Sequence, residues 1–498
     1  MLRVFSQELS DPHKFVVTLE LVPGRESFGR STDTLVGMAR EAFADGRISA
    51  VSITDNPGGN PSLSPDVLGY EIFKYGMDVI VHFTCRDTNR VGMESRALQL
   101  ARMGMKNLLC LTGDYSGKGF EGRGTPVFDL DSVLLSRMIK GLSDRLAASG
   151  DTEPFLQGCG VSPFKALRSE CVTQYKKLDK KIEAGAGFVI TQLGYDINKF
   201  NELIRYHKEK NPQIPVLASV YLLSPGAARA MNKGKVPGAL VSDNLLATIL
   251  EEWKDPKEGM KAAIERAARL GVVLKGLGYR GIHIGGIHKS FEAVGAILDR
   301  MGEIEGQWHQ YMSDFSERAE NTYYWYDHVA PAPTSEGEET GLGARLSNRC
   351  SYSLLSFAHG LFFDKSNFLA PSCRKLSEWL DKNGKTWILK RCLEDPMKMS
   401  MLSCQSCGDC GIQHAAFLCP ESKCPKHTRN GPCGGGKNGF CEVYPEKQLC
   451  IWVRAYDRLK QAGRLTTLLE DEVPPRNWEL NKTSSWVNFH LNRDHQKS

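Results

Sequence analysis

Short apolar runs alternate with longer amphipathic stretches along residues 1–310. The runs are near-continuously apolar and rich in β-branched residues, which is typical of parallel strands buried on both faces. Eight of them lie at residues 15–21, 50–54, 78–84, 107–112, 154–161, 187–193, 215–221 and 281–285. Helix-like segments lie between them, for example at residues 90–104, 132–147, 165–184 and 257–275. This order predicts an α/β fold, a (β/α)8 TIM barrel, with a doubly wound open sheet as the alternative.

The chain changes character after the last of these runs. Residues 329–343 are rich in proline, glycine and acid, as in a linker. Helices are expected afterwards at 372–383 and 386–393, and Trp478 and Trp486 indicate that the final tail packs on the rest of the protein. The expected parts are a barrel at 1–310, a linker at 311–345, a helical segment at 346–400, a cysteine-rich metal-binding module at 401–455, and a C-terminal helix and tail at 456–498.

Composition and charge narrow the functional classes. Of the 498 residues, 41% are hydrophobic and 24% charged, as in ordinary soluble globular proteins. The net charge of +5 is small, and the two signs alternate along the chain, which argues against a dedicated nucleic-acid binder. No apolar run reaches the roughly 18 residues of a membrane span, and MLRVFSQELSDPHKF lacks the apolar core of a secretory signal. We therefore expect a cytoplasmic protein without a membrane span or a nucleic-acid partner.

Cysteines give the first specific chemical signal. There are 15 in the chain, and eight of them fall between residues 404 and 450. Such dense cysteines in a cytoplasmic chain indicate metal rather than disulfides. The C-x2-C-x2-C run followed by Cys-Pro resembles bacterial ferredoxin ligation and favours [4Fe–4S], with zinc as the alternative. The predicted metal ligands are Cys404, Cys407, Cys410, Cys419, Cys424, Cys433, Cys441 and Cys450.

Two glycine patterns have simpler interpretations. Residues 276–281 match G-x-G-x-x-G, but they follow a helix and precede a strand, which is the reverse of a dinucleotide fingerprint and predicts a turn. Residues 434–439 (GGGKNG) lack the ending of a phosphate loop. They predict a close approach of the backbone to a metal site.

Polar residues stand where the apolar runs end, which in a barrel is the catalytic face. Glu20 interrupts the first run, Thr54 ends the second, His82 lies in the third, and Asp114 and Gln192 follow later runs. A carboxylate inside a buried strand is costly unless it is paired or used. Glu20 is therefore the most informative single residue, with a structural ion pair as the alternative.

Taken together these residues resemble a known family. The series VVTLELVPGR, VSITD, HFTC, LTGD, PVFDLDSV and KIEAGAGFVITQ is similar in order and spacing to the methylenetetrahydrofolate reductase family over about residues 10–310. The resemblance implies a flavin-binding barrel that reduces 5,10-methylenetetrahydrofolate to 5-methyltetrahydrofolate. It implies that Glu20 is the general acid, and burial should raise its pKa. It assigns Asp114 to folate and flavin, Gln192 to the pterin, and Thr54, His82, Lys181 and Ala186 to flavin contacts.

The chain departs from the best-known members at three points. Thr112-Gly-Asp114 replaces Arg-Gly-Asp, and residues 160–168 lack a tyrosine and a histidine that contact the adenine half of FAD. FAD is therefore expected, with FMN as the alternative. Residues 232–242 lack the aromatic on which those enzymes position folate and NADH, which speaks against direct use of NAD(P)H.

The cysteine region carries a second resemblance. The segments CGDC, LCP, CPK, NGPCGG and CEV are similar to the C-terminal domain of the same family, over about residues 345–455. The resemblance implies that electrons reach the flavin through iron–sulfur clusters from a protein such as ferredoxin, and that the chain self-associates as a homo-oligomer. The alternatives are the same reductase with NAD(P)H and a structural zinc module, or a non-catalytic partner that binds folate or a corrinoid protein. The methyl group would serve methionine synthesis or one-carbon fixation.

Overall fold

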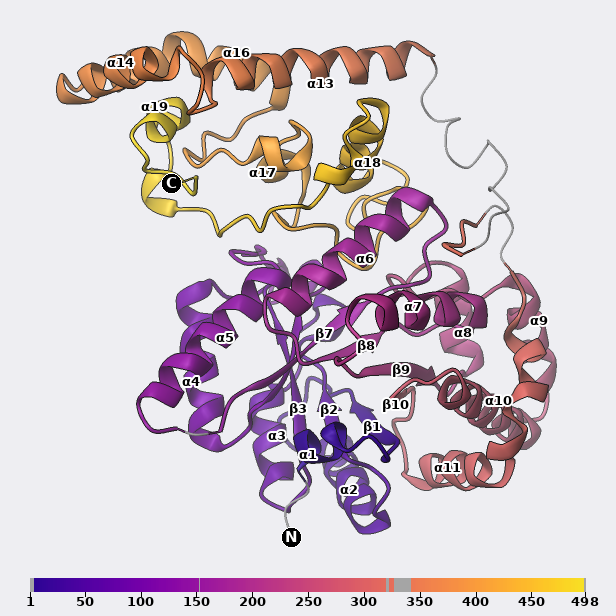
Figure 1. Ribbon diagram of the computed structural model, residues 1–498. Coiled ribbons are helices and arrows are strands. Elements are labelled where there is room, and N and C mark those ends of the chain that lie inside the picture. The colour runs from indigo at the N-terminus through magenta and orange to yellow at the C-terminus, as the bar shows by residue number, and fades with distance from the viewer. Residues whose placement is uncertain (1–3, 152, 319–321, 327–341, 497–498) are drawn as a thin grey trace.

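A computed structural model describes residues 4–151, 153–318, 322–326 and 342–496. Eight parallel strands close into a barrel in the order β1-β10-β9-β8-β7-β4-β3-β2, so the predicted TIM barrel is confirmed and the open sheet is wrong (Figure 1). The strands are β1 (Val16–Leu21), β2 (Ala50–Ile53), β3 (Val79–Thr84), β4 (Asn107–Leu111), β7 (Leu156–Val161), β8 (Phe188–Thr191), β9 (Val216–Tyr221) and β10 (Gly281–Gly285). A short antiparallel hairpin, β5 (Lys118–Gly119) and β6 (Gly122–Arg123), lies outside the barrel.

Helices cover the outside of the barrel and follow the amphipathic stretches closely. In this half of the chain they are α1 (Phe5–Ser10), α2 (Arg30–Asp45), α3 (Pro65–Phe73), α4 (Arg90–Met103), α5 (Ser132–Ala148), α6 (Arg168–Glu183), α7 (Ile197–Lys210), α8 (Pro225–Asn232), α9 (Asp243–Glu252), α10 (Pro256–Gly276) and α11 (Glu292–Ile304). A 3-10 helix, η2 (Glu305–Phe315), packs on α10 and ends at the buried Phe315. The barrel domain thus extends into the range predicted as a linker. Residues 329–341 of that linker lie outside the described residues.

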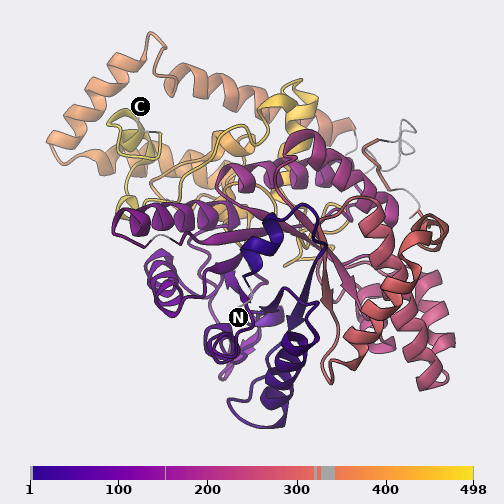
Figure 2. The same ribbon diagram turned by 60° about the horizontal axis from the view of Figure 1, so that its bottom comes forward.

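The barrel interior changes from apolar to polar along its axis. Because side chains alternate across a strand, every second residue faces the interior. At the N-terminal end this interior is filled by Val16, Ile80 and Phe188, among others, and α1 closes it by packing Phe5 edge-on against Phe188, with ring centroids 5.4 Å apart. Figure 2, with the bottom of the molecule turned forward, shows the indigo α1 across this opening. Polar side chains are thereby left for the opposite end.

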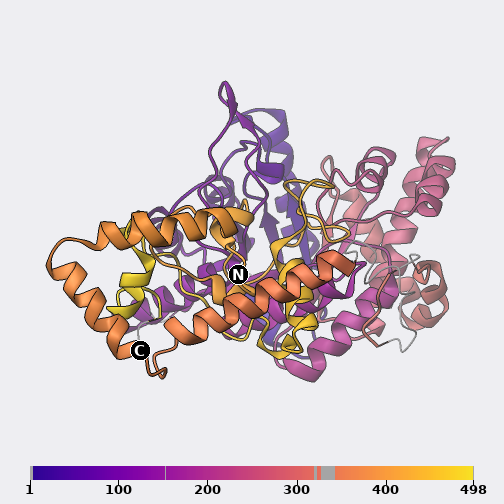
Figure 3. The ribbon, with the colours of Figure 1, turned by 90° about the horizontal axis from the view of Figure 1, so that it is seen from above.

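The C-terminal region lies over the C-terminal end of the barrel, beside α6 (Figures 1 and 3). Its helices are α13 (Leu342–Phe362), α14 (Ala370–Lys382), α15 (Thr386–Leu389), the π-helical turn η3 (Lys390–Glu394), α16 (Asp395–Leu402), α17 (Pro420–Lys423), α18 (Ile451–Gln461) and α19 (Ser485–His490). Shorter 3-10 turns lie at Pro57–Gly59, Ile412–Ala415, Leu465–Thr467 and Trp478–Leu480. Within the described ranges, no helix has the length and apolar character needed to cross a membrane.

Both tail tryptophans make contacts, as the sequence predicts. Trp478 donates from Nε1 to Asp129 of the barrel at 2.8 Å, and the ring of Trp486 lies 5.8 Å from that of Phe363 in the C-terminal region. The two halves also share an apolar core, in which Val172 of α6 packs with residues such as Trp452 of α18. The C-terminal region is therefore packed on the barrel through α18 and the tail.

Asp131 links the barrel to the C-terminal region through hydrogen bonds to the backbone of both. Its Oδ1 caps α5 by accepting from the N–H groups of Val133 and Leu134, while Oδ2 accepts from the N–H groups of Arg429 (3.1 Å) and Asn430 (2.9 Å). The carboxylate is 2% exposed. One buried charge thus satisfies two backbone groups of each half.

We expect Asp131→Ala to lower the free energy of unfolding by about 3–7 kcal/mol, because a helix cap is worth about 1 kcal/mol and each of the two buried N–H groups left unpaired costs about 1–3 kcal/mol. Urea unfolding measures the change, and limited proteolysis should show earlier cleavage within residues 400–480. The matched control is Asp255→Ala, which removes the cap of α10 without touching the C-terminal region and should cost only about 1 kcal/mol. An equal loss of unfolding free energy in the two variants would show that Asp131 does not link the barrel to the C-terminal region.

Candidate active site

A cavity of about 350 Å³ opens at the C-terminal end of the barrel. It is in the size range of small-molecule sites, and it lies at the barrel face where enzymes of this fold place their chemistry. Six of the seven barrel residues singled out in the sequence line it. They are Glu20, Thr54, His82, Asp114, Lys181 and Gln192. Ala186 does not line it: this residue is buried in the turn between α6 and β8, where its N–H donates to the carbonyl of Lys181.

Glu20 points into the cavity beside a histidine that the sequence analysis missed. His283 Nε2 lies 3.6 Å from Glu20 Oε2, and His283 Nδ1 lies 2.8 Å from the hydroxyl of Thr18. Burial raises the pKa of Glu20, but His283, with smaller contributions from His82 and His288, more than offsets it and holds the pKa below its ordinary value. The expectation of a raised pKa is therefore wrong for the site as it stands, because the sequence did not reveal the partner across the barrel.

His82 and Lys181 are both buried in the cavity wall. Burial lowers the pKa of His82 to about 4, so its ring is neutral near pH 7, and its Nε2 lies 2.7 Å from the hydroxyl of Ser52. Burial also lowers the pKa of Lys181, to about 8, and its Nζ donates to the carbonyl of Gly160 at 2.6 Å. These two residues therefore offer the cavity a neutral imidazole and a cation.

Asp114 and Gln192 lie on loops that follow β4 and β8. Asp114 Oδ2 accepts from the N–H of Gly58 at 3.0 Å, and Gln192 Nε2 donates to the carbonyl of Pro237 at 3.1 Å. Each side chain thus has one contact that holds it in place. The other polar atom of Gln192 accepts from the next N–H along the chain, that of Leu193.

Two hydroxyl groups in the cavity have no partner. Thr54 Oγ1 and Ser162 Oγ are buried, both residues line the cavity, and neither oxygen makes a hydrogen bond within the described part of the chain. Buried polar groups in native proteins are nearly always paired, so an unpaired one facing a cavity indicates a ligand contact. Ser162 carries no signal in the sequence pattern.

The C-terminal region supplies one wall of this cavity, through Lys426, Cys433, Gly434, Gly435 and Glu442. Lys426 forms a buried ion pair with Glu442 and donates to the carbonyl of Gly113 at 2.6 Å, directly beside Asp114. Burial disfavours the charge of Lys426, but Glu442 more than offsets this and raises the pKa of the lysine. The barrel rim and the cysteine region therefore meet inside the cavity.

Polar side chains of the α6 segment hold the glycine-rich loop in place. Lys165 Nζ donates to the carbonyl of Gly434 at 2.6 Å, Gln174 Nε2 to that of Cys433 at 2.7 Å, and Lys177 Nζ to that of Gly431 at 3.1 Å. The backbone around the GGGKNG segment thus contacts barrel side chains, and its predicted approach to a metal site stays a prediction.

The eight cysteines of residues 404–450 surround two small cavities. Cys404, Cys407, Cys410 and Cys419 line one, and Cys424, Cys433, Cys441 and Cys450 line the other. Burial raises the pKa of Cys407 and of Cys450 to about 12. None of the eight forms a disulfide.

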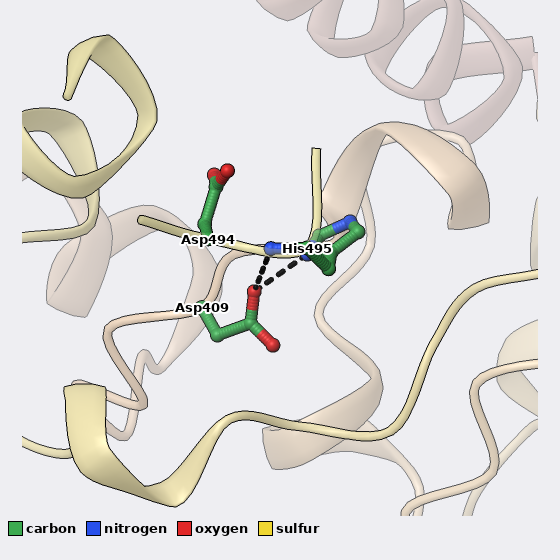
Figure 4. A group of neighbouring side chains, drawn as sticks. All are labelled: Asp409, Asp494 and His495. Atoms are coloured by element: carbon green, nitrogen blue, oxygen red, sulfur yellow. Dashed lines mark hydrogen bonds and ion pairs between the residues drawn. The ribbon is translucent and has the colours of Figure 1, made fainter. Parts of the chain in front are cut away.

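A compact polar group beside the first cavity joins the tail to the cysteine loop (Figure 4). Asp409 Oδ1 accepts from the N–H and Nδ1 of His495, at 3.0 and 2.6 Å, and Oδ2 accepts from Arg429 Nη1 and the N–H of Asn477, both at 3.1 Å. Asp494 lies close by, with its carboxylate turned away in Figure 4. Because both oxygens of Asp409 are used, this group is a structural clamp that fixes the loop between Cys407 and Cys410.

A family model described as "Methylenetetrahydrofolate reductase" matches residues 5–302, more than half of the chain. The chain belongs to the methylenetetrahydrofolate reductase family. A second family model, "Methylene-tetrahydrofolate reductase C terminal", matches residues 388–479, which hold all eight clustered cysteines. The two resemblances seen in the sequence are therefore confirmed at the level of family.

Curated relatives in this family are distant. Methylenetetrahydrofolate reductase 1 of Schizosaccharomyces pombe is 22% identical over 265 residues, which cover 52% of this chain and 42% of that protein. Methylenetetrahydrofolate reductase (NADH) 1 of Arabidopsis thaliana is 23% identical over 240 residues, covering 46% and 39%. The chain thus spans about two fifths of the length of these relatives.

Among solved structures, one is a protein from Clostridium thermocellum described as binding two copies of 5-methyl-5,6,7,8-tetrahydrofolic acid. It aligns with a TM-score of 0.42 and 12% identity over 60% of this chain and 98% of that one.

The structure adds residues that the sequence analysis did not select. His283 interrupts the apolar run GIHIG as Glu20 interrupts its own strand, so the same kind of pattern, with a weaker signal than a carboxylate gives, points to His283. Lys426 and Glu442 carry no such signal, because they lie among the cysteines and reach the cavity only through the folded C-terminal region.

We expect His283→Asn to raise the pKa of Glu20, because burial then acts without its main counterweight. In the wild type the lowered pKa means that Glu20 stabilises the fold above its unfolded-state pKa, and that this contribution is lost as the pH falls through the folded-state value. In the variant, where the pKa of Glu20 is raised, the contribution of Glu20 to stability changes sign. Glu20 then destabilises the fold as the pH rises towards neutral.

Carboxyl ¹³C NMR and the pH dependence of urea unfolding measure this change. His288→Asn is the matched control, since His288 is exposed and its effect on Glu20 is smaller. An unchanged titration of Glu20 in His283→Asn would show that the histidine does not control it.

Proposed function

We propose that this protein is a flavin-dependent reductase that converts 5,10-methylenetetrahydrofolate to 5-methyltetrahydrofolate. One observation carries the proposal: a single cavity is lined by the three residues that the family resemblance assigns to the acid and the folate, beside three of those assigned to the flavin. The six come from strand ends and helices far apart in the sequence, so their convergence is a property of the fold. Family membership supports the same reaction.

The cavity suits a flavin. Thr54 and Ser162 offer unpaired buried hydroxyls, and Lys181 offers a cation of the kind that holds the electron-rich edge or the phosphate of a flavin. When bound, FAD, or FMN as the alternative, would supply the hydride, which no amino-acid side chain can provide. The neutral ring of His82 adds polarity without a second charge.

Glu20 and His283 together suit the acid function. Opening the five-membered ring of the substrate needs a proton on nitrogen, and a carboxyl held near an imidazole can keep one proton close to that atom. Glu20 is 26% exposed, so a folate bound over it would remove water and shift its pKa upwards through burial. His283 then holds or returns the proton at Nε2, while Thr18 fixes the ring.

Asp114 and Gln192 suit the pterin. A carboxylate accepts from the pterin N–H groups, and an amide both donates and accepts, which matches the donor and acceptor edge of that ring. Their loops are fixed by Gly58 and Pro237, so both side chains are oriented before substrate binds. This arrangement reduces the entropy lost on binding.

We assign the supply of electrons to the cysteine region, as [4Fe–4S] clusters reduced by a one-electron carrier protein such as ferredoxin. Each of the two small cavities is lined by four cysteines, the number that a [4Fe–4S] cluster needs. Zinc bound by the same cysteines is the alternative.

We expect Thr54→Val to weaken flavin binding about tenfold, since the loss of one buried hydrogen bond is worth about 1.4 kcal/mol and the shape is kept. Titration of the apoprotein with flavin, followed by fluorescence, measures the change. Ser49→Ala is the control, because the hydroxyl of Ser49 is also buried and unpaired but lies outside the cavity. Equal effects of the two variants would remove Thr54 from the flavin site.

We expect Glu20→Gln to lower the rate of methylenetetrahydrofolate reduction by at least about 100-fold while flavin stays bound, because general acid catalysis contributes about 10²–10⁴-fold. The assay uses dithionite as the electron source, so that it does not depend on the cysteine region. Glu71→Gln, on the exposed side of α3, is the control and should keep the full rate.

The same anaerobic samples should contain flavin and iron. Full activity of Glu20→Gln would make the assigned acid wrong. Zinc without iron would return NAD(P)H as the electron donor, and the absence of flavin after reconstitution would contradict the proposed reaction.

A further inference from the structure

We propose that the eight cysteines form two separate four-cysteine iron–sulfur sites in series. The outer site holds Cys404, Cys407, Cys410 and Cys419. The inner site holds Cys424, Cys433, Cys441 and Cys450, and it alone adjoins the barrel cavity. The direction of electron flow rests on the proposed function, whereas the division into two sites does not.

The division four by four is given by the geometry. Each cavity is lined by four cysteines, and among the described residues the two cavities have no lining residue in common. Close electrostatic neighbours follow the same division: Cys419 interacts with Cys404 and Cys410, while Cys450 interacts with Cys424 and Cys441. The spacing of cysteines in the sequence allows many other groupings, so this division comes from the fold.

Backbone N–H groups are directed at sulfurs in both sites, which is how proteins stabilise cluster thiolates. In the outer site the N–H of Ser406 donates to Cys404 Sγ at 3.3 Å. In the inner site Cys450 immediately precedes α18, and the N–H groups of Trp452 and Val453 in its first turn point at the sulfur. Each site therefore has backbone N–H groups directed at one of its four sulfurs.

The inner site adjoins the barrel cavity, and the two have lining residues in common. Gln174, Pro432, Cys433 and Glu442 line both. The outer cavity shares no lining residue with the barrel cavity, among the residues that the structure describes. Any group held by Cys433 therefore stands next to whatever occupies the barrel.

The two sites are also close to each other. Cys419 and Cys424 flank the four-residue helix α17 at its two ends, and four residues of helix rise about 6 Å. Electrons from a reduced one-electron carrier protein can thus pass singly from the outer site to the inner site and on to the barrel. Each methylene group reduced takes up two electrons and two protons, so two carrier molecules are oxidised and the protons come from solvent.

The test uses the full chain, purified without oxygen, with alanine variants of one cysteine from each site. Cys407→Ala and Cys441→Ala are each expected to halve the iron and acid-labile sulfide, from about eight to about four irons per chain. Adding Cys404→Ala to Cys407→Ala should remove no more iron, whereas combining Cys407→Ala with Cys441→Ala should remove nearly all of it. Cys373→Ala, in α14 and outside both sites, is the matched control and should leave iron unchanged.

Electron paramagnetic resonance of the reduced samples gives a second readout. The two single variants should each lose a different signal. Equal iron loss in the within-site and cross-site pairs would overturn the division, as would loss of all iron from one single variant that unfolds at the wild-type temperature. Where alanine lowers that temperature, the serine variant of the same cysteine is judged by the same criteria.

A separate measurement tests which of the two sites lies next to the flavin. Cys441 belongs to the inner site without lining the barrel cavity, so Cys441→Ala should shift the absorption and reduction potential of bound flavin, and Cys407→Ala should leave both unchanged. The reverse pattern would overturn the order, and zinc in both sites would overturn the electron path. If dithionite-driven folate reduction fails while iron still divides four by four, the proposed function is wrong and the two sites stand.

Discussion

The buried pair of Lys426 and Glu442 is the interaction on which the rest of the structure depends. Lys426 reaches from the cysteine region to the carbonyl of Gly113 in the barrel rim, and Glu442 accepts from the N–H of Gly435 at 2.8 Å in the glycine-rich loop. A buried charge without its partner costs several kcal/mol, so neither residue is stable in place alone. The loop that carries Asp114 and the loop that carries Cys433 therefore have to form together. Both residues line the barrel cavity, and Glu442 also lines the cavity of Cys424, Cys433, Cys441 and Cys450.

The barrel and its polar end could be predicted from the sequence because both follow from local periodicity. Buried parallel strands read as apolar runs, and alternation fixes which side chains face the interior. Glu20, Thr54, His82 and Gln192 occupy alternate positions of the kind that face inwards, and the closed barrel brings them to one cavity. His283 also occupies an inward-facing position. The sequence analysis did not select it, because a single histidine in a five-residue apolar run is a weaker signal than a carboxylate. The pKa of Glu20 could not be predicted, since it depends on that partner across the barrel.

The C-terminal half resisted prediction because its structure depends on contacts between distant residues. The glycine-rich loop shows this most directly. A side chain at Gly435 would lie 2.6 Å from Pro237 of the barrel and 2.2 Å from the carboxylate of Glu442, so only glycine fits there. The sequence predicted a close approach of this backbone to a metal site, and nothing in it indicated that the segment would pack against the barrel. The grouping of the cysteines has the same origin, because spacing along the chain does not fix which sulfurs share a cavity.

The way in which α6 holds the C-terminal region links folding to function. Lys165, just before α6, and Lys177, within it, are almost fully buried. They donate to the backbone carbonyls of Gly434 in the glycine-rich loop and of Gly431 just before it, rather than to carboxylates. A hydrogen bond from a charged group is worth about 1.5–3 kcal/mol, yet burying an ammonium group is costly unless such acceptors are present. These lysines are therefore satisfied only when the loop is docked. Because the docked loop also closes the barrel cavity, the surroundings of Glu20 and Asp114 are complete only in the assembled chain, and the barrel alone is an incomplete site.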